Sequence, residues 1–184
     1  MSWDAERISG PDGEDWRVPV PELEARQTRL SSALAEAGTE SVLIDDPVEL
    51  YWLTGGRQSS LLLIGAEGSG ISNTQWVRRS VVRARYEAGG DGSPHSIETQ
   101  SRMSEFEGNL VAVGCTQAPG MLGGKVPNSR WSFLSSKMGG LGGESEDCTG
   151  MLYALRETKS EWELEMHRES GRINRMMFEV VRDQ

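Results

Sequence analysis

The residue types that most often do chemistry are scarce in this sequence and stand far apart. There are two histidines, His95 and His167, and two cysteines, Cys115 and Cys148. A Glu163–His167 pair on one helix face could contribute to a metal site, but a catalytic zinc needs three protein ligands that converge. The cysteines have neither a metal-binding nor a redox spacing. We therefore expect His167 to be an exposed helix residue, and His95, which follows a Ser-Pro pair, to lie in a surface loop.

Glycine-rich stretches raise the question of a phosphate or dinucleotide site. Gly123-Gly124-Lys125 is the nearest match to a phosphate-binding loop. However, the first glycine of that motif would fall on Pro119, and Val126 stands where Ser or Thr is needed. The Gly68-Ser69-Gly70 turn lacks the third glycine of a dinucleotide fingerprint. Since no spacing pairs two carboxylates in a buried setting, the residues alone predict no active site.

The composition suits one domain with a sizeable core, because the chain has 184 residues. A formal net charge of −9 argues against a nucleic-acid partner, since phosphate binding needs clustered Lys and Arg. The basic run of Arg78, Arg79, Arg83 and Arg85 is a local exception, and we expect it to be a solvated helix face. No apolar run could span a membrane, and no signal peptide or disulfide framework is visible. We therefore expect a cytoplasmic protein with no membrane partner.

Hydrophobic periodicity and turn residues predict alternating helices and strands. Helices are expected over 23–38, 47–54, 76–88, 102–113 and 128–138, and again after Thr149. Strands are expected over 41–44, 60–64, 71–74, 95–98 and 121–126, and residues 110–113 could form a strand instead of the end of a helix. Asp46 and Asn128 are the expected helix caps, and Arg26 is expected on a solvent-facing side of the first helix. The strand over 71–74 is polar enough to be an edge strand. This alternation predicts a mixed α/β sheet covered by helices.

A long amphipathic helix is predicted at the end of the sequence. Ser160 and Glu163 have the spacing of a capping box. Apolar residues then recur at helical spacing: Trp162, Met166, Ile173, Met176, Met177 and Val180. No stop signal follows, so we expect the chain to be a fragment whose last helix leads into another domain. The expected organisation is a polar leader over 1–18, an α/β domain over 19–158 and a linker helix over 159–184, with Met176, Met177 and Val180 uncovered here or buried by a neighbouring chain.

Three stretches together resemble the N-terminal domain of the creatinase/prolidase (Xaa-Pro aminopeptidase) family, whose catalytic domain has the pita-bread fold. The first is the helix Leu23–Gly38 with the strand Ser41–Ile44. The second, Asp46–Gly55, is similar to the family's proline, then tyrosine-leucine-threonine-glycine signature. The third, Leu155–Glu163, is similar to the leucine-arginine, lysine-serine, glutamate junction that precedes the catalytic domain. In this order the resemblance spans roughly residues 19–184.

The resemblance implies a ribonuclease-H-like α/β domain joined by a linker helix to a catalytic half. In the family, that half carries two Asp, one His and two Glu ligands for one or two divalent metals (Mn, Zn, Co or Fe), which activate water for attack on a carbon–nitrogen bond. None of these ligands can be placed in this sequence, so no catalytic, metal or cofactor-binding residue is assigned to it. The parent is expected to be a homodimeric metallopeptidase or hydrolase acting on a peptide or small amide, and this fragment alone to be inactive.

The family's N-terminal domain commonly mediates dimerisation and lends loop residues to the active-site mouth of the neighbouring subunit. By position, the candidate substrate-gating loop here contains Gly56, Arg57 and Gln58. Arg57 is suited to a substrate carboxylate, because a guanidinium presents two parallel donors. The alternative is an ordinary solvated arginine, and Gly56 departs from the bulky residue often found at its position.

The leading hypothesis is thus the non-catalytic N-terminal domain of a metal-dependent creatinase/prolidase-type hydrolase, serving dimerisation and substrate gating. One alternative is a catalytically silent binding module of the same fold, as in the large subunit of the FACT histone chaperone, for which the acidic charge would suit a basic partner. Another is a small freestanding enzyme with a site assembled from His95, Arg57 and scattered acids.

Overall fold

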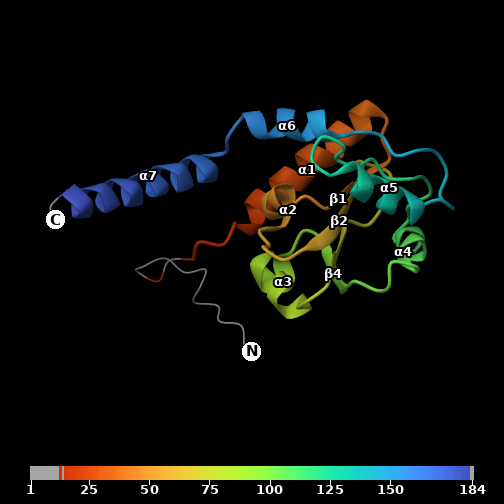
Figure 1. The fold of residues 1–184 in the computed structure, drawn as a ribbon, viewed down its shortest axis with the longest axis horizontal. Helices are drawn as coiled ribbons and strands as arrows, with labels where there is room; N and C mark the ends of the chain where they lie inside the picture. Colours follow the sequence, from red (N-terminus) through yellow and green to blue (C-terminus); the bar gives the residue numbers. More distant parts are fainter. Residues whose placement is uncertain (1–12, 14, 183–184) are drawn as a thin grey trace. The chain divides into compact units, whose positions relative to one another are not determined.

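The structure, a computed structural model, describes Gly13 and residues 15–182, so most of the predicted leader over 1–18 lies outside the described residues. The chain divides into two compact units, one extending to Leu152 and the other beginning at Tyr153. The first contains the sheet and the second contains the long last helix, both visible in Figure 1. The predicted division into a domain over 19–158 and a linker over 159–184 stays a prediction.

A four-stranded mixed sheet lies at the centre of the first unit. Its strands, in spatial order, are β1 (Ser41–Ile44), β2 (Ser60–Gly65), β3 (Thr74–Val77) and β4 (Ser96–Thr99). β1–β2 and β2–β3 pair antiparallel, whereas β3–β4 pair parallel. The helices are α1 (Val20–Ala37), α2 (Pro47–Thr54), α3 (Val81–Glu87), α4 (Phe106–Ala112), α5 (Asn128–Ser136) and α6 (Thr149–Glu157), with a 3-10 turn η2 (Gly90–Gly92). The predicted mixed α/β fold is confirmed.

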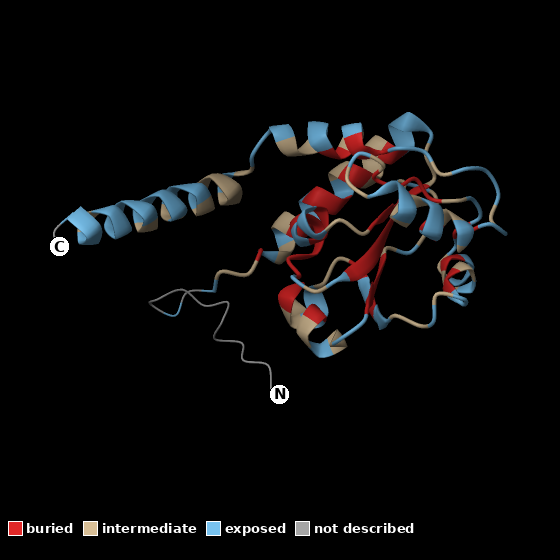
Figure 2. Cartoon of the chain, viewed as in Figure 1, coloured by how far each residue is buried: buried red, intermediate tan, exposed pale blue. Residues whose placement is uncertain are grey.

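β1, β2 and β3 are buried on both faces, since every residue of these strands is buried and successive strand residues point to opposite sides. On one face, Leu43, Leu63 and Trp76 pack in a single cluster with Phe106 of α4 and Leu134 of α5. The Trp76 and Phe106 rings meet edge to face with their centroids 5.6 Å apart, a geometry that aromatic quadrupoles favour. The intervening residues of β1 and β2 are also buried; α1 contacts both strands and α2 contacts β2. Figure 2 shows the resulting buried centre, in red, between the helices.

α1 and α2 end where the sequence predicts, each before a glycine in the left-handed region. Gly38 has φ of 72° and Gly55 has φ of 66°. The Asp46 side chain accepts hydrogen bonds from the backbone N–H groups of Val48 and Glu49, which caps α2. The predicted helix–strand–helix order at the start of the domain is therefore confirmed.

The prediction that Arg26 faces solvent is wrong, since the residue is 1% exposed. Its Nη1 donates to the carbonyl oxygen of Trp52 at 2.7 Å, and its Nε donates to Glu22 Oε1 at 2.7 Å. The guanidinium also lies 5.4 Å from the centroid of the Trp52 ring. Periodicity places Arg26 on α1 but does not show that α2 covers that side of the helix.

The third strand lies three residues later than predicted and is not an edge strand. β3 covers Thr74–Val77 between β2 and β4, where Trp76 and Val77 are each 1% exposed. The polar residues that suggested an edge form the turn, in which Asn73 Oδ1 accepts the backbone N–H of Gly65 at 3.0 Å. Since the strand takes Trp76 and Val77, the following helix begins only at Val81, after the Ser80 cap.

The predicted strand over 121–126 does not form. Gly120 and Met121 make isolated parallel bridges to Val42 and Asp147, and the chain then turns, with the N–H groups of Lys125 and Val126 both donating to the Leu122 carbonyl. Asn128 does not cap α5, because it is already the first helical residue after Pro127. The apolar character of these residues does not indicate that the chain turns after bridges at Gly120 and Met121 alone.

The second unit contains α7 (Glu161–Arg182), a helix of 22 residues. Its predicted capping box is confirmed: Ser160 Oγ accepts the N–H of Glu163 at 3.1 Å, and Glu163 Oε2 accepts the N–H of Ser160 at 2.9 Å. Met176, Met177 and Val180 are 51%, 62% and 61% exposed, as expected for an uncovered stripe. Within the described residues, α7 and the other helices all lack the length and apolar character needed to cross a membrane.

Candidate functional site

The loop that follows α2 packs closely against α3. At Gly55 a Cβ atom would stand 2.9 Å from the carbonyl oxygen of Glu87 and 3.5 Å from the Cβ of Val18. Together with the positive φ of Gly55, this close approach requires glycine. The next N–H, of Gly56, donates to Thr54 Oγ1 at 3.0 Å inside the same turn. The end of the tyrosine-tryptophan-leucine-threonine-glycine stretch is thus where the loop is anchored.

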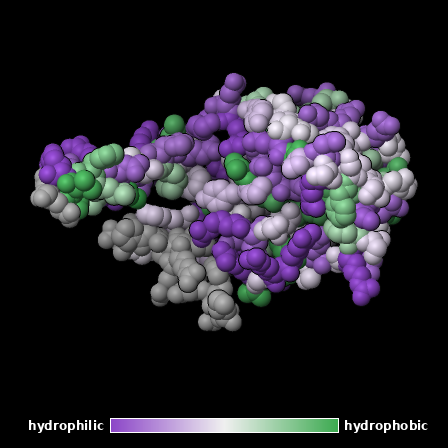
Figure 3. Space-filling model, viewed as in Figure 1, coloured by the Kyte–Doolittle hydropathy of each residue, from purple (hydrophilic) through white to green (hydrophobic). Residues whose placement is uncertain are grey.

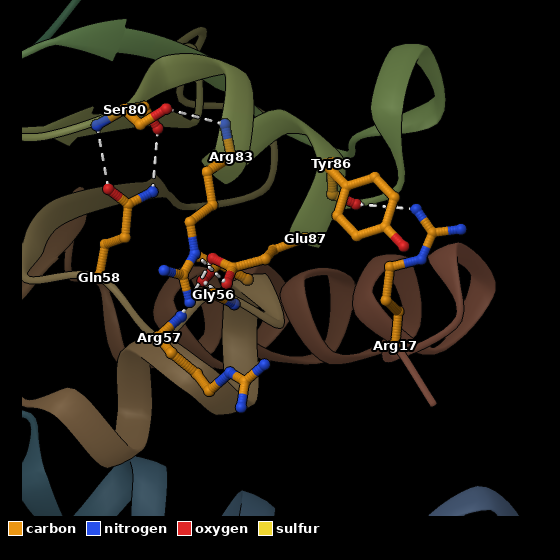
Figure 4. A network of polar contacts seen from close by, with 9 residues as sticks. Arg17, Gly56, Arg57, Gln58, Ser80, Arg83, Tyr86 and Glu87 are labelled. Carbon is orange, nitrogen blue, oxygen red and sulfur yellow. Dashed lines mark hydrogen bonds and ion pairs between the residues drawn. The ribbon is translucent and has the colours of Figure 1, made fainter. Parts of the chain in front are cut away.

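A buried carboxylate holds the loop to α3. The Glu87 side chain is fully buried, and its Oε2 accepts the backbone N–H of Arg57 at 3.2 Å, while its Oε1 accepts Arg83 Nε at 2.9 Å. A buried charge is tolerated only when it is paired and hydrogen-bonded, and Glu87 meets both conditions. Figure 4 shows Arg83 and the Arg57 backbone meeting at this carboxylate.

A side-chain amide holds the loop at the other end of α3. Gln58 Nε2 donates to the carbonyl oxygen of Ser80 at 2.9 Å, and Gln58 Oε1 accepts the N–H of Ser80 at 3.1 Å. Ser80 Oγ in turn caps α3 by accepting the N–H of Arg83 at 3.2 Å. Because the loop is tied to both ends of α3, its backbone forms a fixed platform.

Arg57 is the predicted gating residue whose side chain is available. It is exposed, and in Figure 4 its side chain extends away from the Glu87 carboxylate. Among the residues that the structure describes, its guanidinium has no hydrogen-bond or ion-pair partner. Gly56 is buried, and the amide of Gln58 is used by Ser80. A guanidinium on a fixed platform is well suited to a carboxylate or phosphate oxygen pair.

A further arginine borders the platform from the segment before α1. Arg17 Nη1 donates to the carbonyl oxygen of Tyr86 at 3.0 Å, and its guanidinium carbon lies 4.1 Å from the centroid of the Tyr86 ring. Asp15 pairs with it at 2.6 Å, and this contact lowers the pKa of Asp15. Glu87 and Arg17 were not singled out in the sequence, although the four-residue spacing of Arg83 and Glu87 is a signal for a helical ion pair.

The expectation that His95 lies in a surface loop is wrong, because the residue is 6% exposed. Its Nδ1 lies 2.9 Å from Gln27 Nε2, and its Nε2 lies 3.2 Å from Gln75 Oε1. Burial lowers its pKa to about 4. The polar partners come from α1 and β3, which sequence proximity could not reveal.

The His95 contacts belong to a longer buried chain of hydrogen bonds. Gln27 Nε2 also donates to the carbonyl oxygen of Leu53, Asn73 Nδ2 donates to Gln27 Oε1, and Gln75 Nε2 donates to Ser60 Oγ. Both ring nitrogens of His95 are therefore used for packing α1 and α2 against the sheet. Arg57 does not take part in these contacts, so the structure gives no support to a site that joins His95 to Arg57.

The other residues considered for chemistry are placed apart. His167 is exposed on α7, as expected, and burial raises the pKa of the Cys148 thiol to about 11. The N–H groups of Gly123 and Gly124 are taken by Asp147 Oδ1 and Thr149 Oγ1, each at 2.9 Å. In the part of the chain that the structure describes, no group of three or more His, Cys, Asp or Glu side chains could hold a metal ion.

Solved structures share this fold, although no family model and no curated protein matches the sequence. An Xaa-Pro dipeptidase from Bacillus anthracis is similar with a TM-score of 0.72 and 20% identity, over 86% of this chain and 42% of that one. The N-terminal domain of the cytoplasmic peptidase PepQ from Mycobacterium tuberculosis has a TM-score of 0.59 and 19% identity, over 72% of this chain and 98% of that one. A Creatine_N superfamily domain of a Streptococcus thermophilus dipeptidase has a TM-score of 0.54 and 15% identity, over 71% of this chain and 98% of that one.

These likenesses define the class of fold. The chain has the fold of the N-terminal, creatinase-type domain of Xaa-Pro peptidases. It spans 42% of the dipeptidase and nearly all of the two separate domains. The resemblance drawn from the Asp46–Gly55 and Leu155–Glu163 stretches is confirmed at the level of the fold.

Proposed function

We propose that this chain is the non-catalytic N-terminal domain of a metal-dependent creatinase/prolidase-type hydrolase, in which it serves dimerisation and substrate gating. The single observation that carries the proposal is the fold, which coincides with 42% of an Xaa-Pro dipeptidase and with 98% of an isolated peptidase N-terminal domain. The motif before α7 supports it, since α7 would then be the linker to the catalytic half.

Within this proposal, Arg57 is the residue that faces the substrate of a neighbouring subunit. Its support is the platform: Glu87 and Gln58 fix the loop backbone, and the guanidinium itself is exposed. Because the loop backbone is already held, binding a carboxylate would order only the Arg57 side chain and not the loop as well. The metal and the residues that move protons would belong to the catalytic half, so this chain would bind and orient the substrate only.

The first test concerns the catalytic half. The 184-residue chain with added Mn²⁺ is expected not to hydrolyse an Xaa-Pro dipeptide, and cleavage by the purified chain would contradict the proposal. In the gene, the coding sequence beyond Gln184 is expected to encode two Asp, one His and two Glu metal ligands. Their loss from an otherwise similar domain would favour the catalytically silent binding module.

The second test concerns Arg57 in a protein that contains both halves. Arg57→Gln is expected to raise KM about tenfold for a dipeptide with a free C-terminal carboxylate, with kcat unchanged, because one charge-assisted pair is lost from binding. The matched control is Arg102→Gln, another exposed arginine. For the corresponding dipeptide amide, Arg57→Gln and Arg102→Gln should have equal KM values. Equal KM values for the free dipeptide would refute the role of Arg57.

A further inference from the structure

The segment that carries Arg57 is held at both ends by buried glutamine side chains. Gln27 Nε2 donates to the carbonyl oxygen of Leu53, in the last turn of α2, at 2.9 Å. Gln75 Nε2 donates to the hydroxyl oxygen of Ser60, at the start of β2, at 2.9 Å. The last carbonyl groups of a helix need partners from outside it, so the first contact fixes the point where the chain leaves α2. The second contact fixes the point where the chain enters the sheet.

One imidazole ring joins the two glutamines. His95 Nδ1 lies 2.9 Å from Gln27 Nε2, and His95 Nε2 lies 3.2 Å from Gln75 Oε1. A neutral imidazole has one acceptor nitrogen and one donor nitrogen, which match the amide nitrogen of Gln27 and the amide oxygen of Gln75. We call Gln27, His95 and Gln75 the imidazole brace. Its members come from α1, from β3 and from the residue before β4, so three separate parts of the chain hold one loop.

The imidazole brace lies in the interior of the first unit. Figure 3 shows hydrophilic residues over much of the molecular surface, where water can bond to their polar groups. In contrast, Gln27, Gln75 and His95 are only 3%, 2% and 6% exposed. A buried amide that loses its partner is destabilising, because no water replaces the lost hydrogen bond. The contacts of the brace therefore resist rotation of either amide.

The imidazole ring reinforces the orientation of each amide. If the amide of Gln27 rotated by half a turn, its oxygen would face the carbonyl oxygen of Leu53, and neither group can donate. At Gln75 the ring bonds to the amide oxygen, which leaves the amide nitrogen for Ser60. An apolar side chain in place of His95 would remove this support from both glutamines at once.

The loop lies between the imidazole brace and the anchors on α3. A Cβ atom added at Gly56 would stand 3.8 Å from Gln75 Nε2 and 3.4 Å from Glu87 Oε2. The same Glu87 oxygen accepts the N–H of Arg57. The middle of the loop is thus held by α3, while its two ends are held by the brace.

We propose that His95 is a positioning residue for Arg57, because the imidazole brace fixes both ends of the loop that presents the guanidinium. The ring acts through its two glutamine partners and not through the Arg57 side chain. The positioning follows from contacts within this chain, whereas its use in orienting a substrate rests on the proposed function.

The test is the backbone order parameter from ¹⁵N relaxation of the full chain, which describes motion within the folded state. In the unmodified chain, the N–H groups of Gly56 and Arg57 are expected to have values of about 0.85, typical of a rigid backbone. In His95→Leu, both values should fall to about 0.6, because the support at both loop ends is lost. The N–H groups of Leu43 and Gln100, which bond to carbonyl oxygens elsewhere in the sheet, should keep their values.

Two further variants test the ends of the loop separately. Met has nearly the length of Gln but cannot donate a hydrogen bond. Gln27→Met should lower the order parameter at Gly56, and Gln75→Met should lower it at Ser59. These variants carry the test if His95→Leu does not fold, which circular dichroism shows.

Two controls separate positioning from general destabilisation. Leu34→Ala leaves a cavity at a fully buried position of α1 but keeps the imidazole brace, so the order parameters of the loop should not fall. His95→Gln retains one donor and one acceptor and should keep the loop more ordered than His95→Leu does. Equal loop order in these two His95 variants would contradict the role of the ring.

The proposal is overturned if folded His95→Leu keeps the order parameters of Gly56 and Arg57. It is also overturned if Leu43 loses as much order as the loop, since the whole unit would then have loosened. Failure of the proposed function gives a different result: Arg57→Gln would leave KM unchanged, while His95→Leu would still lower the order parameters of the loop.

Discussion

At the scale of single residues, the surroundings of His95 determine its protonation. Gln27 Nε2 already donates to the Leu53 carbonyl, so Nδ1 of the imidazole accepts its second N–H. Gln75 Oε1 is an acceptor, so Nε2 of the imidazole carries the proton. A second proton on Nδ1 would face a donor in a buried site. The lowered pKa of about 4 agrees with this geometry.

The first prediction follows from that pKa. The unfolded chain binds the proton near pH 6.5 and the folded chain only near pH 4, so stability rises with pH between these values. The stability associated with neutral His95 is fully present above about pH 6.5 and is lost as the pH falls from about 6.5 to about 4. Between pH 7 and pH 5, urea unfolding should show a loss of about 2 kcal/mol from this group.

His95→Gln should remove this pH dependence, whereas the exposed His167→Gln should retain it. An equal slope in both variants would show that another group is responsible. Comparing the two variants at each pH cancels the contribution of carboxylates, which titrate in the same range.

Arginines show the same dependence on surroundings. Arg26 is buried against Trp52, Arg83 is paired with Glu87, and Arg57 is exposed. Local sequence predicted solvent exposure for Arg26, which is wrong, and placed Arg57 in the loop after α2, where the residue is exposed. The difference arises from which element packs over each position, and that information is not local.

At the scale of elements, the junction between α2 and α3 depends on one glycine. Gly55→Ala should destabilise the domain by about 2 kcal/mol, since it combines a positive φ with a Cβ placed 2.9 Å from a backbone oxygen. Urea unfolding of purified protein measures this loss. Gly139→Ala is the control, because nothing lies within 4 Å of its added Cβ. Its free energy of unfolding should change by less than about 0.5 kcal/mol, and a matching loss would contradict the argument.

Strand β3 shows why element boundaries were harder to predict than element order. The residues over 71–74 alternate too weakly to choose a register. The tertiary packing of Trp76 against Phe106 and the turn contact of Asn73 place the strand at Thr74–Val77. A shift of register changes which side chains face the core. The wrong register is unfavourable only once the whole sheet and its helices are in place, so local sequence does not determine it.

At the scale of the molecule, the chain forms two compact units, so we expect a mutation in one unit to leave the stability of the other unchanged. Met177→Lys/Val180→Lys changes two residues that are 62% and 61% exposed, so the urea midpoint of the α/β domain should not move. Leu34→Ala, at a fully buried position of α1, should cost about 3 kcal/mol. A midpoint shift of the α7 variant comparable to that of Leu34→Ala would show that the stripe is buried in solution.

The sequence by itself determined the local structures whose causes are local. The Asp46 cap, the glycines after α1 and α2, the Ser160–Glu163 capping box and the amphipathic α7 depend on a few neighbouring residues, and they also carried the family resemblance. The tertiary structure decided the burial of Arg26 and His95, the place of β3 and the anchoring of the Arg57 loop by Glu87 and Gln58. These features depend on contacts between segments far apart in the chain, because a buried polar group is stable only when another segment supplies its hydrogen-bond partner.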